Sequence, residues 1–415
     1  MTASASRVRW ALLSAALALR LGYAWHGHRA GYVPTAADQY ETIALNLLSG
    51  SGYSIEPGIP TAQREPVYPL FIAACYAPFG RQPWLVLLLQ CLMGTATCAL
   101  AAGLARRLFG ERVGVAALAA CAIHPQLIYY SAYFFRDTVL AVLFAVLARF
   151  SADWSAEPGD PAGDAGAKLG GLAAAGLGLA NSAHLPAMAL GGLGLWLAAP
   201  RPSRLRRAIL YGAPLLLCFG LWSARNIATF GAFVAGSTHG GEEFYQALVV
   251  PPADLGTLRQ REILAADETF TAAASLHEIE RNAVLTRASL RWIAAHPALY
   301  ASRALAGFVK FWRPWPYARA YHHSYAGLVA ASLLSDAWII PLGLLALWVF
   351  RSRWREAPAI WAGAVGLTAV YGAVHAVIRY RLPLVAPMIV MAVAAADWLR
   401  GEYLKGRMET HGRLP

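Results

Sequence analysis

The chain of 415 residues is divided by short polar connections into many long apolar segments, each of a length that suits a membrane-crossing helix. A crossing helix needs about 20 apolar residues, and inside lipid every backbone N–H and C=O must be paired within the protein. Hydrophobic residues make up 58% of the chain and charged residues 14%, whereas soluble domains have roughly 45–50% and 25%. The sequence therefore predicts an all-α integral membrane protein.

Basic residues set the direction of these segments, because short cytoplasmic loops are rich in Lys and Arg. Connections at 106–112, 201–207 and 351–355 carry such clusters and are assigned to the cytoplasm. This predicts about ten spans, with both termini cytoplasmic, in a single polytopic domain over residues 1–415. The spans are expected near residues 10–25, 84–104, 113–130, 138–150, 208–222, 326–350, 360–377 and 384–399, with a Gly/Ala-rich pair between 150 and 200.

Two external loops follow from this topology. The first covers residues 26–83 and contains short interfacial helices, and the second, at 226–325, is the only large loop. Within it, residues 298–312 form either an interfacial helix or a further span, and both options stay open. The loop also contains an amphipathic stretch at 267–291, which we expect to cover the site.

The net charge of +12 does not indicate a nucleic-acid partner, because the basic residues lie in short clusters between apolar segments. Loop topology accounts for most of them. The five cysteines lie in apolar stretches without the paired spacing of metal ligands, and we assign them no chemistry.

Several cations remain on the predicted external face, where the positive-inside rule does not place them. They are Arg64, Arg136, Arg225, Lys310, Arg313, Arg379 and Arg381. Each could reach the interface as an isolated side chain or pair with a loop acid. Seven cations near helix ends on one face instead favour binding of an anionic lipid phosphate.

Two acids lie beside these cations. Asp38 follows the first span, and with Glu41 it also resembles a capping box for a helix at 42–48. Asp137 could pair with Arg136 or cap the next span. An acid at the membrane edge is nevertheless a functional candidate, so both are kept as catalytic candidates.

The chemistry that fits an external acid beside phosphate-binding cations is glycosyl transfer from a polyprenyl-phosphate sugar. The phosphate leaves without protonation, so one carboxylate can take the proton of the attacking acceptor. The phosphate gains negative charge as the bond breaks, and fixed guanidinium groups then stabilise the transition state more than the ground state.

These residues resemble a known family of enzymes. The quoted motifs are Asp38-Gln39-Tyr40, Asn46-Leu47-Leu48-Ser49-Gly50-x-Gly52-Tyr53, Arg64-x-Pro66-x-Tyr68-Pro69, Tyr133-Phe134-Phe135-Arg136-Asp137-Thr138, Trp222-Ser223-Ala224-Arg225-Asn226, Ser237-Thr238-His239-Gly240-Gly241 and Arg379-Tyr380-Arg381-Leu382-Pro383. Together they are similar to bacterial members of the dolichyl-phosphate-mannose-protein mannosyltransferase-like (family 39-like) enzymes of the GT-C superfamily. The chain departs from the eukaryotic protein mannosyltransferases, which have an Asp-Glu pair where this chain has Asp38-Gln39.

The resemblance implies a GT-C-like bundle and an inverting transferase in the inner membrane of a bacterium, with its active site on the periplasmic face. It implies that Asp38 is the catalytic carboxylate and that Asp137 is a second acid. The expected substrate-binding residues are Tyr40, Arg64, Tyr68, Arg136, Arg225, His239, Gly240, Gly241, Arg313, Arg379 and Arg381. Among them, Arg64, Arg225, Arg379 and Arg381 are the implied phosphate ligands.

No cofactor follows from the sequence with certainty. Some relatives use a divalent metal ion, and the histidines that could bind one are His184, His239, His322, His323 and His375. None has a spacing that requires a metal. The aromatic residues Trp312, Trp315 and Tyr317 fit sugar stacking or an interfacial belt.

The expected partners are a polyprenyl-phosphate-sugar donor, membrane lipids and a glycan, lipid or protein acceptor. A polytopic transporter or flippase of a lipid-linked saccharide is the alternative, because Gly-rich segments near residues 170–178 suit helix packing or a substrate path. A non-catalytic polymer-binding protein is the third hypothesis.

Overall fold

The computed structural model describes residues 3–29, 39–251, 254–255, 258–315 and 325–411. Over this part the regular structure is helical, with one isolated β-bridge between Ser54 and Pro60. The α-helices are α1 (Ala3–Arg29), α2 (Tyr40–Leu48), α3 (Val67–Tyr76), α4 (Pro83–Phe109), α5 (Glu111–Ile123), α6 (Pro125–Ser131), α7 (Asp137–Ser151), α8 (Pro161–Ala180), α9 (Leu185–Ala198), α10 (Arg204–Phe230), α11 (Gly240–Val249), α12 (Leu258–Ala266), α13 (Glu268–Ala274), α14 (Glu278–Ala295), α15 (Pro297–Trp312), α16 (Tyr325–Val349), α17 (Pro358–Ala373) and α18 (Leu382–His411). The 3-10 helices are η1 (Ser182–His184), η2 (Arg201–Ser203), η3 (Arg351–Glu356) and η4 (Ile378–Arg381).

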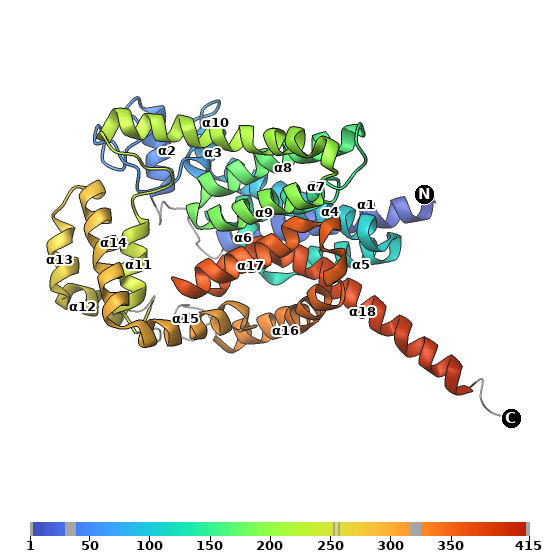
Figure 1. Ribbon diagram of the computed structural model, residues 1–415. Coiled ribbons are helices and arrows are strands. Elements are labelled where there is room, and N and C mark those ends of the chain that lie inside the picture. The colour runs from blue at the N-terminus through green and yellow to red at the C-terminus, as the bar shows by residue number, and fades with distance from the viewer. Residues whose placement is uncertain (1–2, 30–38, 252–253, 256–257, 316–324, 412–415) are drawn as a thin grey trace.

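The long helices form one bundle whose two ends differ. Figure 1 shows the N-terminus of α1 and the C-terminus of α18 toward one end, with the short helices α2, α3 and α11–α14 toward the other. The two segments that the sequence assigns to external loops therefore lie at the same end of the bundle, away from both termini.

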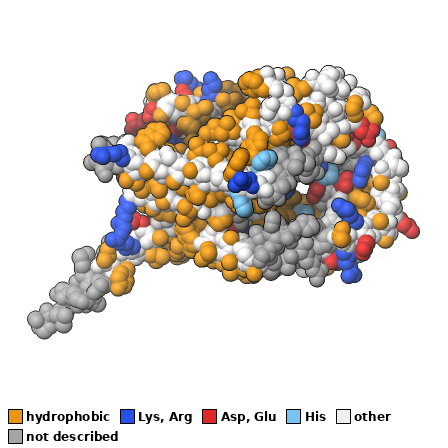
Figure 2. Space-filling view, turned by 180° about the vertical axis from the view of Figure 1, so that it is seen from behind, with side chains coloured by type: hydrophobic (Ala, Val, Ile, Leu, Met, Phe, Trp, Pro, Cys, Tyr) orange, Lys and Arg blue, Asp and Glu red, His pale blue; other side chains and the backbone are white. Residues whose placement is uncertain are grey.

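Each predicted span coincides with a helix or with a bent pair of helices. Among the described residues, four helical segments are long and apolar enough to cross a membrane, and α5 with α6 makes a fifth candidate that is bent by 55°. The helices α7, α9 and α17 have 15, 14 and 16 residues, fewer than the roughly 20 of a full crossing. Figure 2 shows hydrophobic side chains over the middle of the bundle and charged ones toward its ends, as a multi-pass membrane protein requires.

A buried arginine stabilises the break between α5 and α6. Pro125 has no N–H, so the carbonyl of Cys121 four residues earlier cannot receive its usual helical hydrogen bond. The fully buried Arg20 of α1 donates to this carbonyl and to that of Ala122, both at 3.3 Å. A cation at a helix C-terminus also interacts favourably with the helix dipole. The arginine that interrupts the first apolar segment is therefore a helix cap inside the bundle.

Close approach of helices depends on glycine, as is common in membrane bundles. A Cβ at Gly171 of α8 would meet the backbone of Tyr211 in α10, and one at Gly366 of α17 would meet the backbone of Ala187 in α9 at 2.6 Å. The Gly-rich segment near residues 170–178 therefore packs helix against helix.

The large loop folds into helices. The predicted amphipathic stretch at 267–291 is two helices, α13 and α14, separated at Ser275–His277, and of its expected apolar face Leu285 is buried while Leu290 is exposed. Residues 298–312 form α15, which packs along α17 so closely that a Cβ at Gly307 would collide with the backbone of Gly372. With 16 residues, α15 is shorter than a full crossing.

Replacing Arg20 by Met should lower the thermal stability of the detergent-solubilised protein. The change keeps the apolar stem but leaves two carbonyls without a buried donor, at a cost of about 1–3 kcal/mol each. Leu19→Ala, on the exposed face of the same helix, is the control and should change the melting temperature little. Equal melting temperatures for Arg20→Met and the wild type would refute the capping role.

Candidate functional site

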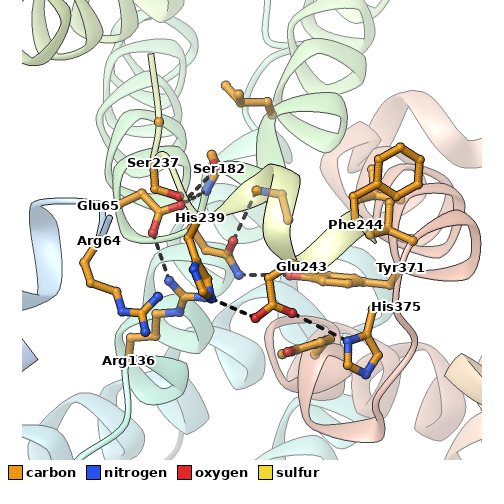
Figure 3. A pocket seen from close by; sticks show the side chains of 18 of the residues that line it. Arg64, Glu65, Arg136, Ser182, Ser237, His239, Glu243, Phe244, Tyr371 and His375 are labelled. Carbon is orange, nitrogen blue, oxygen red and sulfur yellow. Dashed lines mark hydrogen bonds and ion pairs between the residues drawn. The ribbon is translucent and has the colours of Figure 1, made fainter. Parts of the chain in front are cut away.

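A cavity of about 520 Å³ lies where the first loop, the large loop and the ends of several bundle helices meet. Tyr40 and residues 63–65 line it from the first loop, and Arg136 lines it from the residue before α7. The remaining lining comes from η1 and from the start of α11, and also from the end of α17 together with η4. Figure 3 shows these side chains converging on one space.

A buried carboxylate joins three of these segments. Glu65 is 4% exposed, and its Oε2 accepts a hydrogen bond from Arg136 Nη1 at 3.0 Å. Its Oε1 accepts from the backbone N–H and the hydroxyl of Ser182, at 2.9 and 2.8 Å. Arg136 Nη1 also donates to the carbonyl of Ala180 at 3.0 Å, at the end of α8. The first loop is thereby fixed to α7 and η1 (Figure 3).

The environment of Glu65 keeps it ionised. Burial opposes the charged form, but the Arg136 guanidinium and the two Ser182 donors outweigh this, and the pKa of Glu65 falls below its usual 4.5. A carboxylate that is paired in this way positions its arginine and is not available as a base.

Two arginines lie close to the ring of Tyr40. The guanidinium carbons of Arg64 and Arg136 each lie 5.8 Å from the centroid of this ring, which is within cation–π distance. The buried ring of Tyr68 contacts Tyr40 edge-on at a centroid distance of 5.1 Å, and its hydroxyl donates to Gln90. Tyr68 therefore supports Tyr40 from the core and does not line the cavity.

The opposite wall carries a second ionic contact. Arg379 of η4 lies 3.6 Å from the carboxylate of Asp137 at the start of α7, and its guanidinium also stacks on Phe135 and Tyr380. Asp137 is 4% exposed, so it is held beneath the cavity surface. Arg136 has Glu65 as its hydrogen-bonded carboxylate and Asp137 as a nearby charge.

A third acid links the large loop to the bundle. Glu243 of α11 lies between two histidines, at 3.0 Å from His239 Nε2 and 3.6 Å from His375 Nδ1. Burial raises the pKa of Glu243, but its contacts with the two histidines more than offset this, and the pKa ends well below its usual value. Gly240, at the start of the same helix, lines the cavity as well.

Asp38, the predicted catalytic residue, lies outside the described residues, as do Tyr317, His322 and His323. The N-cap of α2 is Gln39, and Glu41 bonds to Tyr76 and Arg81 at 2.6 and 2.9 Å. Gln39 is the one described non-glycine residue with positive φ, at 66°. Such strain is often found at functional sites, and here it lies beside Asp38 and Tyr40.

Four other predicted substrate-binding residues have structural contacts away from the cavity. Arg225 donates to the carbonyls of Thr61 and Tyr53 at 2.8 and 3.2 Å and so braces the first loop against α10. The N–H of Gly241 donates to Asn282 of α14 at 2.7 Å. These two residues shape the loops and do not line the cavity.

Arg381 and Arg313, which the sequence also places among the substrate-binding residues, likewise lie away from the cavity. Arg381 is 1% exposed and is paired with the buried Asp336 of α16 at 2.8 Å. Arg313 Nε donates to the carbonyl of Trp315, and its guanidinium stacks on that ring. Both cations lie outside the cavity lining.

Sequence reasoning overlooked two acids of the cavity, Glu65 and Glu243. Glu65 occupies the unassigned position of the Arg64-x-Pro66 motif, and Glu243 follows Gly240-Gly241. The available signal was that Glu65 lies inside a quoted motif and that Glu243 lies two residues after another. What sequence cannot supply is the partner of each carboxylate, because Ser182 and His375 are more than 100 residues away along the chain.

The described residues contain no candidate metal site. Among them, no three or more His, Cys, Asp or Glu side chains are grouped so as to hold a metal ion. His184 is buried, and its Nδ1 lies 3.1 Å from the carbonyl of Asn181. The described site thus does not fit a divalent ion, and we derive no step through one.

Comparison with known proteins supports the fold. Residues 63–227 match the sequence model of the family described as dolichyl-phosphate-mannose-protein mannosyltransferase. The solved archaeal oligosaccharyltransferase AglB from Archaeoglobus fulgidus, in complex with an inhibitory peptide and a dolichol-phosphate, is similar with a TM-score of 0.57 and 14% identity, over 100% of this chain and 52% of that one. The apo oligosaccharyltransferase of the same organism is similar with a TM-score of 0.55 and 13% identity, over 98% and 52%.

The chain thus spans about half the length of these solved relatives. No curated protein sequence matches it. At such low identity the likeness shows the fold alone, and it confirms the predicted all-α membrane bundle.

Replacing Glu65 by Gln should destabilise the fold by about 3 kcal/mol at neutral pH, because it leaves the partly buried guanidinium of Arg136 without its counter-charge. A carboxylate whose pKa is lower in the folded than in the unfolded protein stabilises the fold at pH values above its unfolded pKa. This stabilisation is lost as the pH falls through the folded pKa. The difference in melting temperature between wild type and Glu65→Gln should therefore be full above pH 4.5 and shrink below it. Glu56→Gln, an exposed acid of the same loop, is the control; a pH-independent difference would contradict the ionic role.

Proposed function

We propose that this chain is an inverting glycosyltransferase of the GT-C superfamily that moves a monosaccharide from a polyprenyl-phosphate donor to an acceptor. The observation that carries this proposal is the cavity in which Arg64, Arg136 and Arg379 converge around Tyr40 and the end of α17. Guanidinium groups bind phosphate through paired N–H donors, with fixed geometry.

The acids of the site support a phosphate-binding role for these arginines. Glu65 and Asp137 each contact an arginine, Arg136 and Arg379 respectively, and are themselves almost fully buried. Guanidiniums that are oriented before the substrate arrives need little rearrangement when the leaving phosphate gains charge. Arg64 and Arg379 are the proposed contacts to the donor phosphate, with Arg136 as the fixed cation between the loop and η1.

Asp38 is the proposed base. It is two residues before Tyr40, which lines the cavity, and next to the strained backbone of Gln39. In the proposed reaction the acceptor oxygen attacks the anomeric carbon and its proton passes to Asp38. The bond from that carbon to the phosphate oxygen breaks, the polyprenyl phosphate leaves with the bonding electrons, and the configuration inverts.

A lipid donor fits the position of the cavity. The cavity lies at the end of a hydrophobic bundle, where a phosphate can sit at the membrane surface while its chain remains in lipid. The solved relative with dolichol-phosphate and an inhibitory peptide supports a polyisoprenoid phosphate as the donor carrier. The acceptor is proposed as a glycan, lipid or protein at the periplasmic face of a bacterial inner membrane, to which the loops at 26–83 and 226–325 belong.

Replacing Asp38 by Asn should abolish sugar transfer while leaving donor binding intact, because the amide keeps the shape but cannot accept the proton. General-base catalysis contributes about 10²–10⁴-fold, so turnover should fall by that range. The measurement is release of radiolabelled sugar from a panel of polyprenyl-phosphate sugars by protein in lipid. Full activity of Asp38→Asn would exclude it as the base, and a panel with no binding or turnover would favour the transporter alternative.

Arg64→Gln and Arg379→Gln should each weaken donor binding by about tenfold, since each removes one charge-assisted contact. Arg313→Gln, a cation of the same region that does not line the cavity, is the matched control. Binding of a fluorescent polyprenyl phosphate to the protein in nanodiscs measures the effect. If all three variants bind like the wild type, the cavity is not the phosphate site.

A further inference from the structure

A second cavity, of about 270 Å³, lies between α1, α4 and α5, far from the site described above. Trp10 and Leu13 of α1 and Ala102 of α4 contribute apolar lining, and Arg9, Arg106 and Glu111 contribute charge. The wall of this cavity is largely apolar and is therefore poorly suited to ordered water.

The polar groups of this cavity come from three helices. Arg9 Nε lies 3.5 Å from Glu111 Oε1, at the start of α5, and Arg106 is exposed near the end of α4. Glu111 Oε1 is buried, and it is in ionic contact with Arg9 but accepts no hydrogen bond from the described residues. The three side chains sum to one net positive charge.

The position of the cavity favours an amphiphile. α1 begins and α5 lies at the end of the bundle toward the termini (Figure 1), where basic residues are concentrated. Trp10 is 69% exposed at the rim, and an exposed indole at such a position is typical of the membrane interface. One face of the cavity is thus apolar and the other cationic, which is the pattern of a site for an anionic lipid head group.

We propose that this cavity binds one anionic phospholipid of the phosphatidylglycerol class. Its phosphodiester carries one negative charge and interacts with Arg9 and Arg106. A hydroxyl of the head group donates to Glu111 Oε1, and the upper part of an acyl chain lies against Trp10, Leu13 and Ala102. Phosphatidylcholine offers neither the net charge nor the donor.

The lipid would join α1 to the hairpin of α4 and α5. A Cβ at Gly114 would meet Ala102 and Arg106 at 3.2 and 3.0 Å, so α4 and α5 are in close contact. α1 is bonded to the end of α5 through Arg20, and the lipid would add a second junction nearer its N-terminus. This binding site is independent of the proposed transferase reaction.

The test is lipid retention by the full-length protein, purified in detergent and examined by native mass spectrometry. Dioleoyl-phosphatidylglycerol, dioleoyl-phosphatidylcholine and water-soluble glycerol phosphate are added in separate titrations. The wild type should bind one phosphatidylglycerol in preference to phosphatidylcholine, and Arg106→Gln should weaken this by about fivefold, as one basic residue at an anionic head group implies. Arg112→Gln is the matched control, because this exposed arginine pairs with Asp397 outside the cavity.

A second readout covers variants that fold poorly. Phosphatidylglycerol should raise the melting temperature of the wild type and of Arg112→Gln, and raise that of Arg106→Gln less. Equal retention of both lipids, or equal loss in the two arginine variants, overturns the proposal. Competition by glycerol phosphate at the same concentration also overturns it, because the site would then take its phosphate from solution.

Discussion

The contact between Glu65 and Arg136 is the interaction on which the candidate site depends. It joins a loop of the first hundred residues to the start of α7 and, through Ser182, to η1. A buried carboxylate needs both a counter-charge and hydrogen bonds to remain ionised, and Glu65 has them. Because Arg136 is held in this way, it can flank the ring of Tyr40 without a substrate present, and the wall of the cavity is formed in advance.

The other buried charges discussed above also have a counter-charge or hydrogen bonds. Arg20 caps the broken helix before Pro125. The carboxylate of Asp336 accepts hydrogen bonds from Arg381 and Gln126 at 2.8 and 2.9 Å. Intramembrane charges are expensive unless they are paired or bonded to backbone carbonyls. In this protein Arg20 fixes the bend between α5 and α6, and the pair of Arg381 and Asp336 fixes η4, which also carries Arg379. The polar interior thus positions the cavity residues without lining the cavity itself.

Sequence reasoning predicted the helical membrane fold, and it placed Tyr40, Arg64, Arg136, His239, Gly240 and Arg379 among the binding residues, all of which line the cavity. They come together in space because they follow helix ends that topology assigns to one side, and their role in binding stays a prediction. Tyr68 and Arg381 have the same signature, yet they are buried in the core. Whether a polar residue near a helix end faces a cavity or a partner depends on which helices pack together, and a single sequence does not contain that information. Glu65 was overlooked for the same reason, since its partner Ser182 is distant in the chain.

The most direct test of the account is the fate of a polyprenyl-phosphate sugar on purified protein reconstituted in vesicles, followed by NMR of the anomeric centre. The account predicts that sugar is transferred, that free polyprenyl phosphate appears in equal amount, and that the product has the opposite anomeric configuration to the donor. Movement of the intact lipid-linked sugar between leaflets, with no polyprenyl phosphate released, would contradict it.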